Sequence, residues 1–61
     1  MFKPNPNAIQ AELDKLNARQ PGGFYHTPED KRWIVSTTKH KYLPGSNLFI
    51  FWEAVEKELS K

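Results

Sequence analysis

The chain lacks the features that stabilise or anchor many small proteins. Its 61 residues include no cysteine, so neither a disulfide bond nor a thiolate zinc site can form. No apolar run approaches the roughly 20 residues that a membrane-spanning helix needs, since the longest is the run 48–52. No apolar stretch follows the first residues either, so we expect no signal peptide and no membrane attachment. Together with the missing cysteines, these absences predict a cytoplasmic protein.

The short length excludes whole classes of protein. A Rossmann sheet or a (β/α)₈ barrel needs well over a hundred residues, so we expect one domain over 6–61, preceded by a flexible arm over 1–5. The sequence offers no nucleophile with a neighbouring base, and so small a chain encloses a water-free cleft with difficulty. His26 and His40 lack the spacing of a metal site. We therefore expect no enzyme activity, no cofactor, no metal and no small-molecule substrate.

Aromatic residues are the main candidates for a hydrophobic core. Four Phe, two Tyr and two Trp make up 13% of the chain, although its mean hydropathy of −0.74 is polar. Each aromatic side chain buries on the order of 150–250 Å² when it packs. These residues argue against disorder.

The first regular element is a helix over 6–19. Asn5 is a good N-cap, and proline is favoured at the first helical position. Ile9, Leu13 and Leu16 form an apolar stripe at helical spacing. The Pro-Gly-Gly run that follows ends the helix.

The central segment has two interpretations. In the first, 24–27 and 32–38 are strands of a β-hairpin, because the second run is rich in strand formers. Trp33 would then lie in the core. In the second, Thr27 caps a helix that begins at Pro28. We favour the hairpin, because the end of the segment is poor in helix formers.

The last segment favours a C-terminal helix capped by Ser46 or Asn47. Its apolar face would hold Leu48, Trp52, Val55 and Leu59. A short strand over 48–51, with the helix starting near residue 52, is the alternative. The predicted fold is therefore a small α+β domain with an N-terminal helix, a central β-hairpin (or a short helix plus wing) and a C-terminal helix.

Charge is unevenly distributed along the chain. Residues 31–52 contain four basic residues and no acid, for a net charge of +4, whereas 1–30 and 53–61 each carry −1. Cations interleaved with aromatic residues favour binding to the phosphate backbone of nucleic acid. We therefore predict a non-enzymatic DNA-binding accessory or regulatory protein, with Trp33 packed beneath the cations. The predicted phosphate contacts are Lys31, Arg32, Lys39, His40 and Lys41.

Three segments resemble the phage excisionases, small DNA-bending proteins that set the direction of recombination. Residues 16–20 (LNARQ) resemble the end of their first helix, and 27–35 (TPEDKRWIV) their capped basic helix. Residues 45–50 (GSNLFI) with 52–59 resemble their wing, closing strand and last helix. The resemblance implies a winged-helix fold. It also implies DNA contacts by Lys31 and Arg32 from the recognition helix, with residues 39–41 at the wing.

The aromatic run supports an alternative function. Five large apolar residues in a row exceed what one helix face buries, and an exposed apolar patch usually marks a partner surface. Phe49, Ile50 and Phe51 are the predicted contacts. The chain would then be a protein-binding module, such as a phage- or plasmid-encoded modulator of a host protein, or would associate with a second copy of itself.

Overall fold

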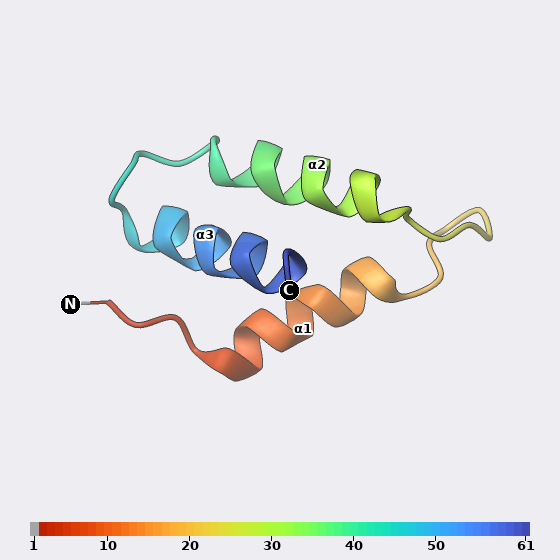
Figure 1. Ribbon diagram of the computed structural model, residues 1–61, viewed down its shortest axis with the longest axis horizontal. Helices are drawn as coiled ribbons and strands as arrows, with labels where there is room; N and C mark the ends of the chain where they lie inside the picture. The colour runs from red at the N-terminus through yellow and green to blue at the C-terminus, as the bar shows by residue number, and fades with distance from the viewer. Residues whose placement is uncertain (1) are drawn as a thin grey trace.

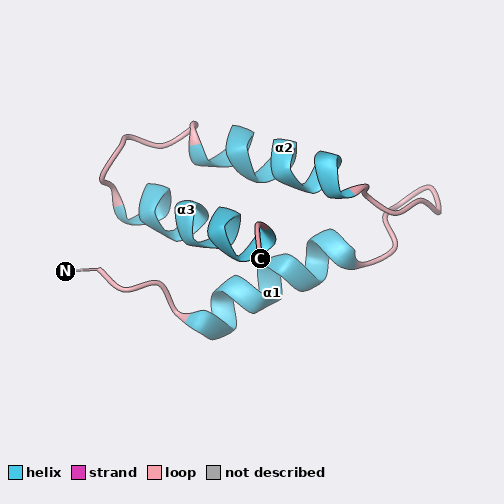
Figure 2. Cartoon of the chain, in the orientation of Figure 1, coloured by secondary structure: helices cyan, strands magenta, loops and turns pink. Residues whose placement is uncertain are grey.

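The computed structural model describes residues 2–61, and its regular elements are three helices (Figure 1). They are α1 (Pro6–Asn17), α2 (Pro28–Lys39) and α3 (Asn47–Leu59). The described residues form no sheet, as Figure 2 shows, and the predicted α+β class and its hairpin are therefore wrong. The domain is all-helical and elongated, with principal extents of 39 × 22 × 21 Å.

Helix α1 confirms the predicted N-terminal helix. The Asn5 side chain accepts a hydrogen bond of 2.8 Å from the backbone N–H of Asn7, as an N-cap does. The helix ends two residues earlier than expected. The chain then turns tightly, with the Gln20 N–H donating to the Phe24 carbonyl at 2.8 Å. Gly23 has a φ of 82° in this turn, a conformation that glycine adopts at little cost.

Helix α2 replaces the favoured hairpin. Thr27 and Asp30 form a reciprocal capping box, in which the Asp30 N–H donates to the Thr27 hydroxyl at 3.1 Å. The β-branched residues that favoured a strand are accommodated within the helix. Thr38, for example, donates its hydroxyl proton to the Ile34 carbonyl at 2.8 Å. Cap chemistry and packing outweigh the weak strand propensity of the segment.

Helix α3 begins at the predicted cap. The Ser46 hydroxyl accepts a hydrogen bond of 3.2 Å from the Phe49 N–H. Residues 48–51 are helical, so the alternative of a short strand is wrong. For the same reason the segment 45–50, which the excisionase resemblance assigns to a wing and closing strand, forms neither.

Helix α3 is the centre of the fold. It packs along α2 on one side and against α1 on the other, whereas α1 and α2 contact each other only weakly (Figure 1). Val35 of α2 and Val55 of α3 are the fully buried side chains of the described residues, each 0% exposed. The apolar stripe of α1 is only half-buried. The core therefore lies between α2 and α3, and it is thin.

The helical phase of α2 overturns the predicted place of Trp33. In a strand, residues 33 and 35 share a face, but in a helix two positions differ by about 200°. Because Val35 points into the core, Trp33 points outward and is 69% exposed. The prediction that Trp33 packs beneath the cations is therefore wrong.

Candidate interaction surface

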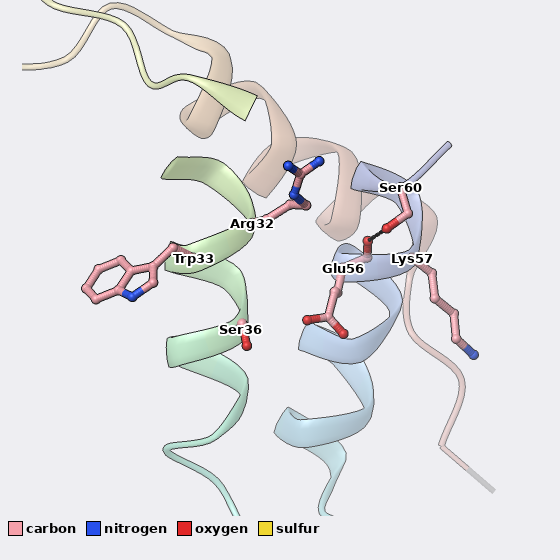
Figure 3. A pocket seen from close by; sticks show the side chains of 6 residues that line it. All are labelled: Arg32, Trp33, Ser36, Glu56, Lys57 and Ser60. Carbon is pink, nitrogen blue, oxygen red and sulfur yellow. Dashed lines mark hydrogen bonds between the residues drawn. The ribbon is translucent and has the colours of Figure 1, made fainter. Parts of the chain in front are cut away.

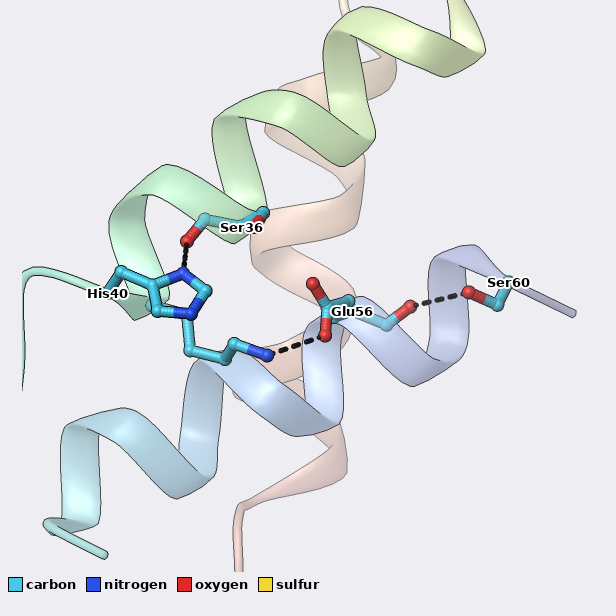
Figure 4. A network of polar contacts seen from close by, with 5 residues as sticks. Ser36, His40, Glu56 and Ser60 are labelled. Carbon is cyan, nitrogen blue, oxygen red and sulfur yellow. Dashed lines mark hydrogen bonds and ion pairs between the residues drawn. The ribbon is translucent and has the colours of Figure 1, made fainter. Parts of the chain in front are cut away.

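Lys39, a predicted phosphate contact, lies inside the fold. Its Nζ is 2.8 Å from Oε1 of Glu56 on α3, and its side chain is 12% exposed. The ammonium group also lies 5.5 Å from the centroid of the Phe49 ring, a cation–π distance. Glu56 is part of the polar network drawn in Figure 4, which ties α2 to α3. Lys39 thus stabilises the helix pair, and its charge is already neutralised.

Lys31 also makes an internal contact. Its Nζ donates to the side-chain oxygen of Asn17 at 2.8 Å, and the residue is half-buried. The bond joins the start of α2 to the end of α1. Because α1 and α2 contact each other only weakly elsewhere, this bond helps to hold the two helices together.

The other three predicted contacts are exposed but spread out. Arg32 lies near the start of α2, and His40 and Lys41 lie just beyond its end. The part of α2 from Arg32 to its last residue, Lys39, is already about 10 Å long, and His40 and Lys41 lie beyond it. His40 already makes contacts within the fold, since its Nδ1 lies 2.7 Å from the Ser36 carbonyl and its ring meets the Phe49 ring edge to face. The structure therefore does not gather the five predicted cations into one patch.

A shallow groove of about 560 Å³ runs between α2 and the end of α3. In Figure 3, the Trp33 ring and the Lys57 side chain extend to opposite sides, and the Glu56 carboxylate lies between the two helices. The Ser60 hydroxyl donates to the Glu56 carbonyl at 3.2 Å. The groove is lined by Arg32, Trp33, Ser36, Glu56, Lys57 and Ser60. Its mixed charges and diverging side chains do not converge on one reacting atom, as a catalytic site requires.

The predicted partner residues Phe49, Ile50 and Phe51 are half-buried. Phe49 lies beneath Lys39, and the ring of Phe51 meets that of Trp52 edge to face at 5.5 Å. Residues 49–52 thus contribute to packing on several sides of α3, whereas Leu48 at the start of the run is 52% exposed. Among residues 2–61, most of the exposed large apolar side chains lie outside this run.

The most exposed apolar residues lie elsewhere. Tyr25 precedes α2 and Leu43 follows it, and a second groove of about 470 Å³ borders Leu43 and Leu48 at the α2–α3 turn. Among residues 2–61, the large apolar residues that are more than half exposed are Phe24, Tyr25, Trp33, Leu43 and Leu48. The hydrophobic pattern of the sequence did not identify these residues as a surface. The capping box at Thr27 was the signal that could have found Trp33, because it sets the start of α2 and with it the helical phase that turns Trp33 outward.

One face of α2 points away from α3. Glu29, Trp33 and Thr37 follow each other at intervals of four residues and are exposed. We call these three residues the outer face of α2. An exposed tryptophan lies at its centre, with an acid toward the start of the helix.

Comparisons with known proteins do not assign the chain to a family. No protein-family model matches it, and no curated protein and no solved structure is significantly similar to it. Within residues 2–61, no three metal-binding side chains cluster. No helix in that range is long and apolar enough to cross a membrane.

Proposed function

We propose that this chain is a small non-enzymatic protein-binding module that uses the exposed apolar side chains on and around α2. One observation carries the proposal. A tryptophan that is 69% exposed lies at the centre of the outer face of α2, whose residues are all exposed. Tryptophan is strongly enriched among the residues that dominate binding energy at protein interfaces.

The thin core supports the same function. The accessible surface is 4589 Å², against about 4,100 Å² for a compact monomer of this mass. This surface includes five large apolar side chains that are more than half exposed, and burying them against a partner would add hydrophobic stabilisation.

Site-specific photo-crosslinking tests the proposal. A photoreactive benzoylphenylalanine replaces Trp33, and a matched variant carries it at Lys15, which is 75% exposed on α1. On irradiation in the native cells, we expect covalent protein adducts from position 33 and few from position 15. Equal labelling at both positions, or no protein adduct at position 33, would exclude the proposal.

Nucleic-acid binding is a second candidate, favoured by a separate observation. Arg32, Lys41 and Lys57 are exposed and form no ion pair within residues 2–61. Arg32 and Trp33 are consecutive in α2, so one turn of the helix offers both a cation and an aromatic ring suited to stacking. The excisionase resemblance, which implies DNA contact from residues 27–35, points to the same end of α2.

A salt titration of duplex DNA binding tests this candidate. Arg32→Ala and Lys41→Ala should each weaken binding and reduce the slope of log K against log salt by about 1, as the loss of one phosphate contact does. Lys15→Ala, on α1, is the control. If affinity and slope are the same in all four proteins, DNA binding through this segment is excluded.

A further inference from the structure

The charges on the outer side of α2 have opposite signs at its two ends, because Arg32 near its start points toward α3 and lines the groove there (Figure 3). Glu29 and Asp30 lie in the first turn, and Lys41 lies just beyond the last. All three are exposed, and Trp33 lies between them on the outer face. A helix with an acidic start and a basic end is complementary to an antiparallel copy of itself.

The register of such a pair follows from helix geometry. If Trp33 of one copy lies opposite Thr37 of the other, the twofold axis passes at the height of residue 35. Glu29 then lies opposite Lys41 of the second copy, and Asp30 is offset by one residue, about 1.5 Å. Lys41 follows the end of α2 in a turn that continues the winding of the helix, with its N–H donating to the Thr38 carbonyl at 3.1 Å. It therefore lies close to the flank that holds Asp30, and the twofold axis brings the two residues to the same side of the seam. Apolar contact and charge pairing thus occur in one arrangement.

We propose that two copies of this chain associate through the outer faces of α2, antiparallel about a twofold axis. The proposal rests on the proposed function, since it names a second copy as the protein that covers Trp33. Each tryptophan packs against Thr37 of the second copy, and two equivalent acidic–basic clusters flank the pair. A parallel arrangement is disfavoured because it would place like charges opposite each other.

The exposed residues at both ends of α2 extend this surface. In the antiparallel arrangement, the loop that carries Tyr25 in one copy approaches the turn that carries Leu43 in the other. Figure 1 shows these two segments at opposite ends of α2. Helix α2 alone, with 12 residues, is only about 18 Å long. Its contact is therefore smaller than a standard interface, and we expect a dissociation constant between about 10 μM and 1 mM.

Sedimentation equilibrium of the full chain at low salt measures the association. We expect a monomer–dimer equilibrium that Trp33→Ala weakens at least about tenfold, as the loss of a central interface tryptophan does. Trp33→Ala should leave the helical circular dichroism unchanged, because the side chain is largely exposed. A chain that stays monomeric at 1 mM, or a dimer insensitive to Trp33→Ala, would overturn the proposal.

Charge reversal tests the antiparallel register. Lys41→Glu places acids at both ends of the seam and should weaken the dimer about tenfold. The double variant Glu29→Lys/Lys41→Glu restores opposite charges and should recover most of the loss. Lys3→Glu, in the N-terminal arm, changes the net charge equally and is the matched control. If Lys41→Glu and Lys3→Glu behave alike, or if the double variant is no better than Lys41→Glu, this register is wrong.

Carbodiimide, which joins a carboxylate directly to an amine, detects the contact itself. Within one chain, Asp30 and the end of α2 at Lys39 are about 13 Å apart along the helix and Lys41 lies beyond that end, so a direct link between Asp30 and Lys41 must join two copies. Mass spectrometry of mixed ¹⁴N and ¹⁵N chains should show Lys41 of one isotope joined to Glu29 or Asp30 of the other. Mixed dimers that lack this link would contradict the proposed contact.

The two proposals fail in different ways. If the chain is monomeric but position 33 crosslinks to another protein in cells, the self-association is wrong and the protein-binding function stands. If position 33 yields adducts of the chain with itself and Trp33→Ala dissociates the dimer, both are supported. If neither experiment finds a protein contact at Trp33, both are excluded.

Discussion

The α2–α3 pair and α1 are stabilised in different ways. Helices α2 and α3 contribute the two fully buried side chains, Val35 and Val55, and an ion pair between Lys39 and Glu56 joins them. Helix α1 has no fully buried side chain and packs mainly against α3. Hydrophobic stabilisation scales with the apolar surface removed from water. The stability of the domain is therefore concentrated in residues 28–59, and α1 is a peripheral layer.

Truncating a core valine should show the largest difference between these regions. We expect Val55→Ala to lower the free energy of unfolding by about 2–3 kcal/mol, because it removes two methyl groups from a fully enclosed site. Leu13→Ala on α1 removes more atoms but from a half-buried site, and it should cost only about 1 kcal/mol. Urea unfolding followed by circular dichroism at 222 nm measures both. Equal losses would show that α1 shares the core.

Two lysines that are two residues apart provide the next test. Lys39→Met keeps much of the side-chain packing but removes the ion pair with Glu56, which should cost about 1–2 kcal/mol. Lys41 is exposed and forms no ion pair within residues 2–61, so Lys41→Met should change stability by less than about 0.5 kcal/mol. Thermal unfolding of the two variants gives the comparison. If Lys39→Met is as stable as Lys41→Met, the ion pair does not stabilise the helix pair.

Helix caps provide the smallest effect. Thr27→Ala removes the hydroxyl of a capping box on α2 and should lower the free energy of unfolding by about 1 kcal/mol. Asn5→Ala should fray the start of α1 and cost about 0.5 kcal/mol, because α1 contributes less to the core. Hydrogen exchange resolves the two: protection should fall across α2 and α3 for Thr27→Ala, and only within α1 for Asn5→Ala. Uniform loss of protection in both variants would mean that the three helices unfold as one unit.

Local signals were sufficient to predict two of the three helices. Asn5 with Pro6, and Ser46 before an apolar stripe, mark the starts of α1 and α3, and the structure places both caps there. The same kind of signal was present at Thr27. The prediction gives more weight to the β-branched residues of 34–38, which favour a strand. In the structure this segment is a helix, and the packing of Val35 against α3 stabilises it.

The candidate surface was harder to predict, for two physical reasons. The hairpin prediction assigns the strand period of two residues to a segment that has the helical period of 3.6. It therefore places Trp33 in the core, whereas in the helix the side chain lies on the surface. The Lys39–Glu56 ion pair joins residues that are 17 apart in sequence, and no local pattern announces such a contact. Arg32, His40 and Lys41, by contrast, are exposed as a solvent-facing cation cluster would require, though not as one patch.

The short connection between α2 and α3 has a kinetic consequence. Residues that pair across the two helices, such as Lys39 and Glu56, are only 17 positions apart, so little loop-closure entropy is lost when they meet. Helical domains with such local contacts fold in microseconds to milliseconds. We therefore expect α2 and α3 to form the folding nucleus, with α1 docking onto α3 after the rate-limiting step.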